Sequence, residues 1–175
     1  MQLTSQILLD TTNEQADALK RTMRLTNSCC DFMSKRAFEL NVFGRFALQK
    51  LIYREIRDTF PALSAQVVIR ALAKVCDGYA SDDKKQRRFK PLGAIPYDSR
   101  ILSFKVTGKM VNIWSVDGRL KMPFQCGERQ LELLNGKRGE ADLCYVNGHF
   151  YLFVACEVDS PNQIDVDGVL GVDQE

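Results

Sequence analysis

Long hydrophobic runs are missing from this sequence. None approaches the roughly 18 consecutive apolar residues that a membrane span needs. The first residues, MQLTSQILLD, also lack the basic start and the cleavage site of a secretory signal. We therefore expect a cytoplasmic protein that has no membrane partner.

Paired metal ligands are missing as well. The chain has six cysteines, none of them in a C-x-x-C pair, and Cys29 and Cys30 are adjacent. That spacing suits neither a structural disulfide nor a tetrahedral zinc site, so we expect reduced thiols in the core and no zinc. The only histidine, His149, follows an Asn-Gly pair and has no neighbour that suggests catalysis. We expect it on the surface.

Basic residues are absent from the last part of the chain. Residues 139–175 contain eight Asp and Glu and no Lys or Arg, whereas residues 1–138 contain all 24 Lys and Arg and 14 acids. The net charge of +2 therefore conceals a strongly basic body. Such a body favours a polyanionic partner, because neutralising phosphates supplies affinity whatever the base sequence. The acidic end fits a segment of a metal-dependent site better than a nucleic-acid surface.

Helical patterns occupy residues 11–85. Thr12 followed by Gln15 forms a capping box, and apolar residues then recur at helical spacing. The segment Asn41 to Gly44 ends this first helix, and Ser64 can cap the third of the three stripes. The sequence therefore predicts a block of three helices.

Residues 91–158 have the opposite character, with short runs rich in Val, Ile and aromatic residues. Asp117-Gly118 joins one pair of runs, and Asn147-Gly148 joins another, which is a strong hairpin signal. We expect a small antiparallel β-barrel here. The β-prone run at residues 3–10 has no local partner, so we expect it to pair with this barrel. The fold class is then α+β, with the helices inserted into a β domain.

Several stretches in this order resemble the N-terminal part of the TnpB (OrfB-type) family of transposon-encoded RNA-guided DNA nucleases, which are related to compact type V CRISPR effectors. The resemblance rests on FALQKLIYREIRDTF (46–60), FKPLGAIPYDSRILSF (89–104), DGRLKMPF (117–124), GKRGEADLCYVNGHFYL (136–152) and DGVLGVD (167–173).

The resemblance implies a specific domain plan. Residues 1–10 and 91–160 would form a wedge domain, a β-barrel of oligonucleotide-binding type. Residues 11–90 would form the inserted helical recognition lobe, and residues 161–175 a linker and the opening strand of an incomplete RuvC-like nuclease domain. The implied partners are a transposon-end-derived guide RNA and double-stranded target DNA with a short adjacent motif. The implied location is the nucleoid.

Asp173 takes the position of the first of the family's three RuvC carboxylates, which hold Mg²⁺ in the complete enzyme. The family's later carboxylates and its zinc module do not occur within these 175 residues, and Gln174 and Glu175 replace the usual Leu-Gly. We therefore expect no metal on this chain and no cleavage by it alone. A non-cleaving regulator that binds nucleic acid, or a decayed fragment of such a nuclease, are the alternative interpretations.

The densest basic run, at residues 82–90, is expected to neutralise phosphates of guide RNA or of the heteroduplex, although a solvated helix end has the same composition. The third helix is expected to help read the motif beside the target, and surface polarity is the alternative. Trp114 and Tyr97 are candidates for base stacking or for the core. The residues expected to contact nucleic acid are Lys50, Arg54, Gln66, Arg70, Lys74, Lys84, Lys85, Arg87, Arg88, Lys90, Arg100, Lys105, Lys109, Lys137 and Arg138.

Overall fold

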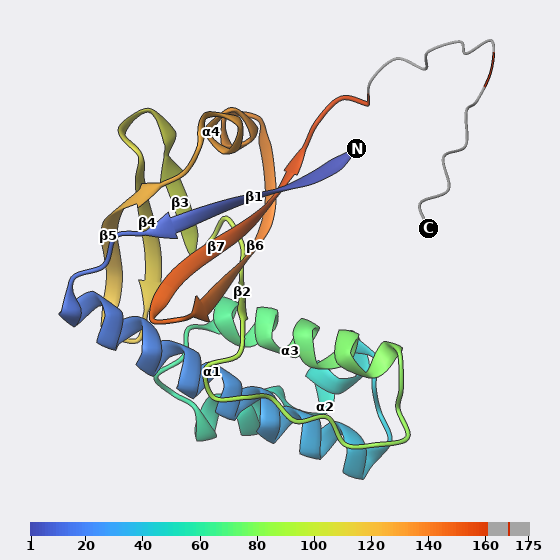
Figure 1. Ribbon diagram of the computed structural model, residues 1–175. Helices are drawn as coiled ribbons and strands as arrows, with labels where there is room; N and C mark the ends of the chain where they lie inside the picture. The colour runs from blue at the N-terminus through green and yellow to red at the C-terminus, as the bar shows by residue number, and fades with distance from the viewer. Residues whose placement is uncertain (161–167, 169–175) are drawn as a thin grey trace, which may run out of the picture.

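The computed structural model describes residues 1–160 and Gly168. Within this part, seven antiparallel strands form one nearly closed barrel in the order β2-β6-β7-β1-β5-β4-β3. Figure 1 shows the helices α1 to α3 against one end of the barrel, and α4 at the other. The strands are β1 (Gln2–Leu9), β2 (Ile95–Tyr97), β3 (Leu102–Lys105), β4 (Met110–Ser115), β5 (Gly118–Gln125), β6 (Lys137–Val146) and β7 (His149–Glu157).

The first strand lies in the middle of the sheet, as the sequence predicted. β1 pairs with β7 from Gln2↔Glu157 to Leu8↔Tyr151, and with β5 at its end. The chain then leaves the barrel for residues 13–80 and returns at β2. The expected α+β fold, in which helices interrupt an antiparallel barrel, is therefore confirmed at this level.

The helical part consists of α1 (Asn13–Leu40), α2 (Arg45–Thr59) and α3 (Ala65–Ala80). The predicted capping box is present, since the Thr12 hydroxyl accepts from the Gln15 amide and the Gln15 side chain accepts from the Thr12 amide. Asn41 ends α1 in the left-handed conformation, and the Ser64 hydroxyl caps α3. Local sequence signals therefore set these helix ends correctly.

Thr12→Ala is expected to lower the free energy of unfolding by about 1 kcal/mol, because the first turn of α1 loses its side-chain cap. Chemical denaturation followed by circular dichroism measures this change. Thr11→Ala is the matched control, since no side-chain hydrogen bond of Thr11 occurs within the described residues. Equal stability of the two variants would contradict the capping role.

One helix was not predicted. α4 (Glu128–Asn135) follows β5 inside the stretch that the sequence analysis assigned wholly to strands. Leu134 is buried against the barrel, and the Ser5 hydroxyl of β1 donates to the Gln130 carbonyl at 3.0 Å. The apolar spacing from Leu131 to Leu134 is a signal that was available, but it spans a single turn. α4 therefore covers the end of the barrel that the other helices leave open.

The turns and thiols agree with the sequence analysis. Asn147 and Gly148 both have positive φ values, 51° and 81°, as the β6–β7 hairpin requires. All six cysteines are free, and four of them are buried. Burial raises the pKa of the Cys29 and Cys30 thiols to about 12, so these thiols stay protonated and unreactive.

Among the described helices, none is long and apolar enough to cross a membrane.

Candidate nucleic-acid interface

The predicted basic run does not continue a helix. It belongs to residues 81–94, which link α3 to β2, contain no helix or strand, and run across α1. We call this segment the strap. Three α1 side chains on one stripe hold its backbone. The Ser34 hydroxyl donates to the Arg87 carbonyl at 2.6 Å, and the Asp31 carboxylate accepts from the Phe89 amide at 2.7 Å. The interpretation of this run as a helix end was therefore wrong.

Asn27 completes the attachment of the strap. Its side-chain amide is fully buried and donates to the carbonyls of Pro91 and Gly93, at 3.1 and 2.9 Å. Its oxygen accepts from the Lys74 ammonium at 2.9 Å. The strap is thus fixed at alternate positions along its second half.

Lys74 is a structural link more than a free cation. Its ammonium also donates to the Ala94 carbonyl at 2.5 Å and lies 5.0 Å from the centre of the Phe89 ring. Burial lowers the pKa of Lys74, and the carboxylates of Asp31 and Asp142 oppose that shift. The predicted role in reading DNA has no support from this position, because the ammonium already makes two hydrogen bonds within the fold.

Most cations of the strap face solvent. Lys84, Lys85, Arg88 and Lys90 are exposed, and none of them forms an ion pair with a described residue. Arg87 is different: its guanidinium donates to the Asp82 carbonyl at 3.0 Å and to the Ser81 hydroxyl at 3.2 Å. Arg87 therefore shapes the strap, and its four basic neighbours are available for a ligand.

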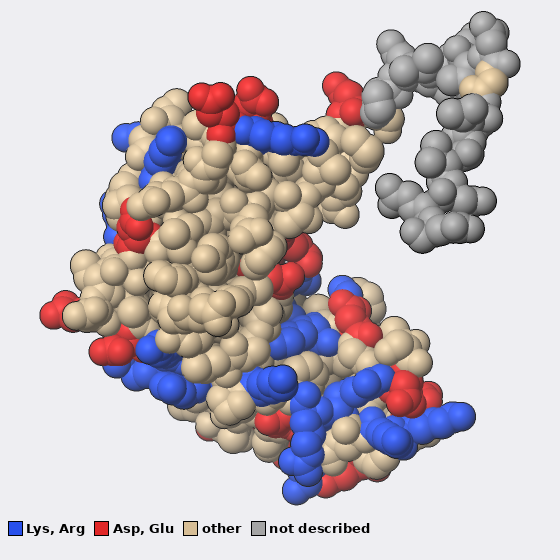
Figure 2. Space-filling view, viewed as in Figure 1, with Lys and Arg blue, Asp and Glu red and all other residues tan. Residues whose placement is uncertain are grey.

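Two further cations on α1 extend this surface, and sequence reasoning missed them. Lys20 and Arg24 lie one helical turn apart, on the side of α1 that also carries Asp31. Lys20 lies 5.0 Å from the centre of the Tyr145 ring, and so reaches the barrel. Figure 2 shows Lys and Arg gathered over the helical part, while the barrel above is largely uncharged on this face. The basic band is defined here as Lys20, Arg24, Lys84, Lys85, Arg88 and Lys90.

Two predicted recognition residues of α3, Gln66 and Arg70, connect the helices to the barrel through Asp98 and Glu140. We call these four residues the latch. The Arg70 side chain is only 14% exposed, with its Nε 3.7 Å from the Asp98 carboxylate and its Nη1 bonded to Glu140. Gln66 donates to Asp98 as well, and accepts from Arg100 at 3.0 Å. Gln66 and Arg70 therefore lie on one side of α3, as the sequence suggested, but both are bound to acids of this chain.

The two predicted cations of α2 remain free. Lys50 and Arg54 are exposed on the outer side of the helix, and neither forms an ion pair with a described residue. The neighbouring acid Glu55 instead pairs with Arg36 of α1, with 3.2 Å between Nε and Oε2. The acid nearest to these two cations in the sequence is therefore bound to α1.

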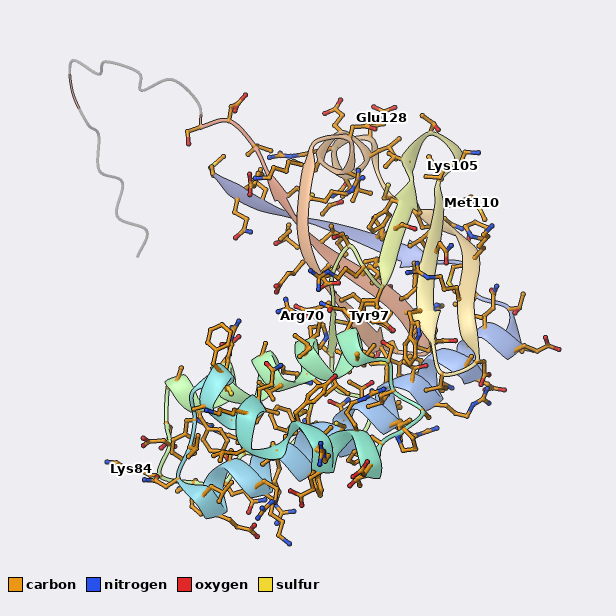
Figure 3. All side chains as sticks on the ribbon, turned by 180° about the vertical axis from the view of Figure 1, so that it is seen from behind. Arg70, Lys84, Tyr97, Lys105, Met110 and Glu128 are labelled. Atoms are coloured by element: carbon orange, nitrogen blue, oxygen red, sulfur yellow. The ribbon has the colours of Figure 1, made fainter. Side chains whose placement is uncertain are left out.

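The remaining predicted cations lie far from the basic band. Figure 3 shows Lys105 at one end of the molecule and Lys84 at the other, with Arg70 and Tyr97 between them. Lys105 ends β3, and Lys109 lies in the β3–β4 connection with a left-handed backbone. The structure does not gather all the predicted residues into one surface.

Lys137 and Arg138, two of the predicted contact residues, lie in a strand. Gly136 caps α4, and Lys137 and Arg138 begin β6, which has a bulge between Arg138 and Ala141. Lys137 pairs with Glu157 at 2.7 Å, and the Arg138 guanidinium lies 5.6 Å from the centre of the Phe104 ring. Lys137 is therefore partly neutralised by an acid of β7, and Arg138 lies over an aromatic ring of β3.

The aromatic candidates belong to the barrel core. Tyr97 is 1% exposed, and its hydroxyl donates to the Trp114 carbonyl at 2.9 Å. Trp114 is half-buried and packs against the core. Burial raises the pKa of Tyr97. Of the alternatives left open for these rings, the core is correct for Tyr97, while His149 is exposed as expected.

The described residues contain no group of three His, Cys, Asp or Glu side chains placed to hold a metal. Asp173, its expected Mg²⁺ and the expected nuclease strand lie outside the described residues. A scan against protein-family models gave no match, and no curated protein is significantly similar in sequence. The function is therefore inferred from the positions and contacts of the chain's own residues.

Proposed function

We propose that this chain binds nucleic acid as the guide-RNA- and target-DNA-binding part of an RNA-guided DNA endonuclease similar to the TnpB family. In this proposal the barrel acts as a wedge of oligonucleotide-binding type, and α1 to α3 act as the recognition lobe. The position of the helices between β1 and β2 is consistent with that division. Base pairing by the guide would supply target specificity, and the protein would bind the sugar-phosphate backbone.

The observation that carries the proposal is the basic band on a fixed backbone. Ser34, Asp31 and Asn27 hold the second half of the strap, so the backbone that carries Arg88 and Lys90 is fixed before a ligand arrives. A preformed surface loses less conformational entropy on binding than a flexible loop does. Between Lys20 and Ser34, α1 rises about 21 Å, which equals roughly six nucleotide steps along one strand. The band therefore matches a backbone track of several phosphates.

The latch residues have a different place in the proposal. The Gln66 amide donates to Asp98, and Nη1 of the Arg70 guanidinium donates to Glu140. Base readout by these side chains requires those bonds to be exchanged for bonds to a base edge. Phosphate binding by the basic band needs no such exchange. We therefore assign binding of the sugar-phosphate backbone to the basic band. We assign reading of the motif beside the target to α3 only if Gln66 and Arg70 release Asp98 and Glu140.

A charge-removal experiment tests the proposal. A variant with Lys84, Lys85, Arg88 and Lys90 replaced by Ala should bind a labelled RNA hairpin and a labelled DNA duplex at least about tenfold more weakly at low salt. The slope of log K against log salt should become shallower by about 0.9 for each lost duplex phosphate contact. Fluorescence anisotropy over a salt series measures both quantities.

The matched control removes the same charge from the barrel, at Lys105, Lys109, Lys121 and Arg129, all of which are exposed. We expect this variant to bind with nearly the wild-type salt slope. Thermal unfolding of both variants checks that the fold is retained. A strap variant that binds as tightly as wild type, or a control variant that binds more weakly than the strap variant, would refute the basic band as the interface.

A further inference from the structure

α2 carries the two most exposed large apolar side chains of the described residues. Phe46 is 89% exposed and Leu51 is 59% exposed. Phe46, Gln49, Lys50, Tyr53 and Arg54 line an open hollow of about 520 Å³. Exposing a phenylalanine forgoes about 1.5–3 kcal/mol of burial energy, so a ring held in water on a rigid helix calls for a partner.

Helical geometry separates this face from the core. Leu48, Ile52 and Ile56 are the buried residues of α2 and point towards α1 and α3. Phe46 and Lys50 are one turn apart on the opposite side, and Tyr53 and Arg54 continue the same stripe in the next turn. The packing of α2 is thus complete without Phe46, whereas Tyr53 is half-buried and packs partly against the core.

The charge of the stripe is positive and unopposed. Lys50 and Arg54 form no ion pair with any described residue, whereas Glu55 is held by Arg36 on the side facing α1. The stripe therefore alternates aromatic rings with free cations along one helix. A polyanion with flat, apolar faces complements that pattern. A single-stranded nucleic acid has both properties, whereas a duplex keeps its base faces stacked inside.

We propose that the outer face of α2 binds a single-stranded segment of nucleic acid, with bases stacked on Phe46 and Tyr53 and phosphates paired with Lys50 and Arg54. Phe46 and Tyr53 are separated by about 10.5 Å of helix rise, which equals roughly three stacked base steps. This inference rests on the proposed function and specifies one ligand, an unpaired strand of about that length.

The α2 face is separate from the basic band. The strap attaches to α1 through Asn27, Asp31 and Ser34, while α2 packs on another side of α1, where Phe32 meets Phe60 with 5.7 Å between ring centres. A ligand on one face therefore does not occupy the other. In this proposal the basic band binds the phosphates of single-stranded or double-stranded nucleic acid, and the outer face of α2 binds unstacked bases.

Substitutions at Phe46 test the inference, because so exposed a side chain is not needed for folding. With a single-stranded DNA oligonucleotide that contains 2-aminopurine, Phe46→Ala should weaken binding about 5- to 100-fold, the range for one lost base stack. Phe46→Trp should keep the affinity and the change in 2-aminopurine fluorescence. Phe46→Leu, which is apolar but cannot stack, should behave like Phe46→Ala. Binding of a duplex should change less than about twofold.

The outcomes separate this inference from the proposed function. If the strap variant loses affinity for the duplex while Phe46→Ala binds the single strand normally, the stacking site is refuted and the proposed function stands. Wild-type binding by Phe46→Leu would also refute the stacking site, because leucine cannot stack on a base. Competition by polyglutamate as strong as that by the oligonucleotide would refute it too, because an acidic protein segment would then be the fitting partner. Normal binding of every probe by both variants would overturn both proposals.

Discussion

Asn27→Ala is expected to lower the free energy of unfolding by about 3 kcal/mol and to release the second half of the strap from α1. The substitution removes both donors to the Pro91 and Gly93 carbonyls and one acceptor of the Lys74 ammonium. All these groups are at least partly buried, and each loses a partner that water replaces poorly. Urea denaturation measures the stability, and hydrogen exchange measures the opening of the strap.

The adjacent position supplies the control for this prediction. Ser28 is exposed and follows Asn27 on α1, so Ser28→Ala should change stability by less than about 0.5 kcal/mol. Asn27→Ala should also weaken nucleic-acid binding, although every cation of the basic band is still present. Full affinity in a variant whose strap exchanges rapidly would show that the fixed backbone does not matter for binding.

Asp98→Ala is expected to cost about 3 kcal/mol, because it leaves the Arg70 guanidinium without its main buried counter-charge. The Arg70 and Asp98 side chains are 14% and 20% exposed, whereas Glu140, the other acid at this arginine, is 65% exposed. Glu140→Gln should therefore cost less than about 1 kcal/mol, as exposed ion pairs contribute little.

The same two variants report on the latch. Asp98 lies just after β2 and Arg70 lies on α3, so the contact joins the barrel to the helices. Loss of Asp98 should increase amide exchange in α3, which Glu140→Gln should leave unchanged. Thermal denaturation and hydrogen exchange distinguish the two. Equal destabilisation by both substitutions would show that burial does not control the strength of this contact.

Sequence reasoning predicted the features that depend on neighbours in the chain. The capping box joins Thr12 to Gln15, and the β6–β7 turn needs only Asn147 and Gly148. The pairing of β1 with the later barrel was also predicted, since an isolated apolar strand needs partners. In each case a short pattern or a single requirement for hydrogen bonding was sufficient.

The features that were missed depend on distant residues. Asn27 has the sequence context of any polar helical residue, and its partners lie 64 and 66 positions later. The helical pattern around Arg70 predicts a cation on the surface, but its partner Glu140 lies 70 positions later in the sequence. Lys20 and Arg24 become part of a surface only because the strap crosses α1 beside them. No local pattern encodes these contacts, so the sequence could suggest basic residues but not how they are grouped.

The central place of β1 in the barrel also has a consequence for biosynthesis. β1 is made first, yet its longest partner, β7, ends at Glu157. At about 5–20 residues per second, a ribosome takes roughly 7–30 s to supply that partner. Meanwhile α1 to α3 are complete and can form their mostly local contacts. We expect α1 to α3 to fold during translation. We expect β1 to stay unpaired until β7 is synthesised, and a chaperone can bind it during that time.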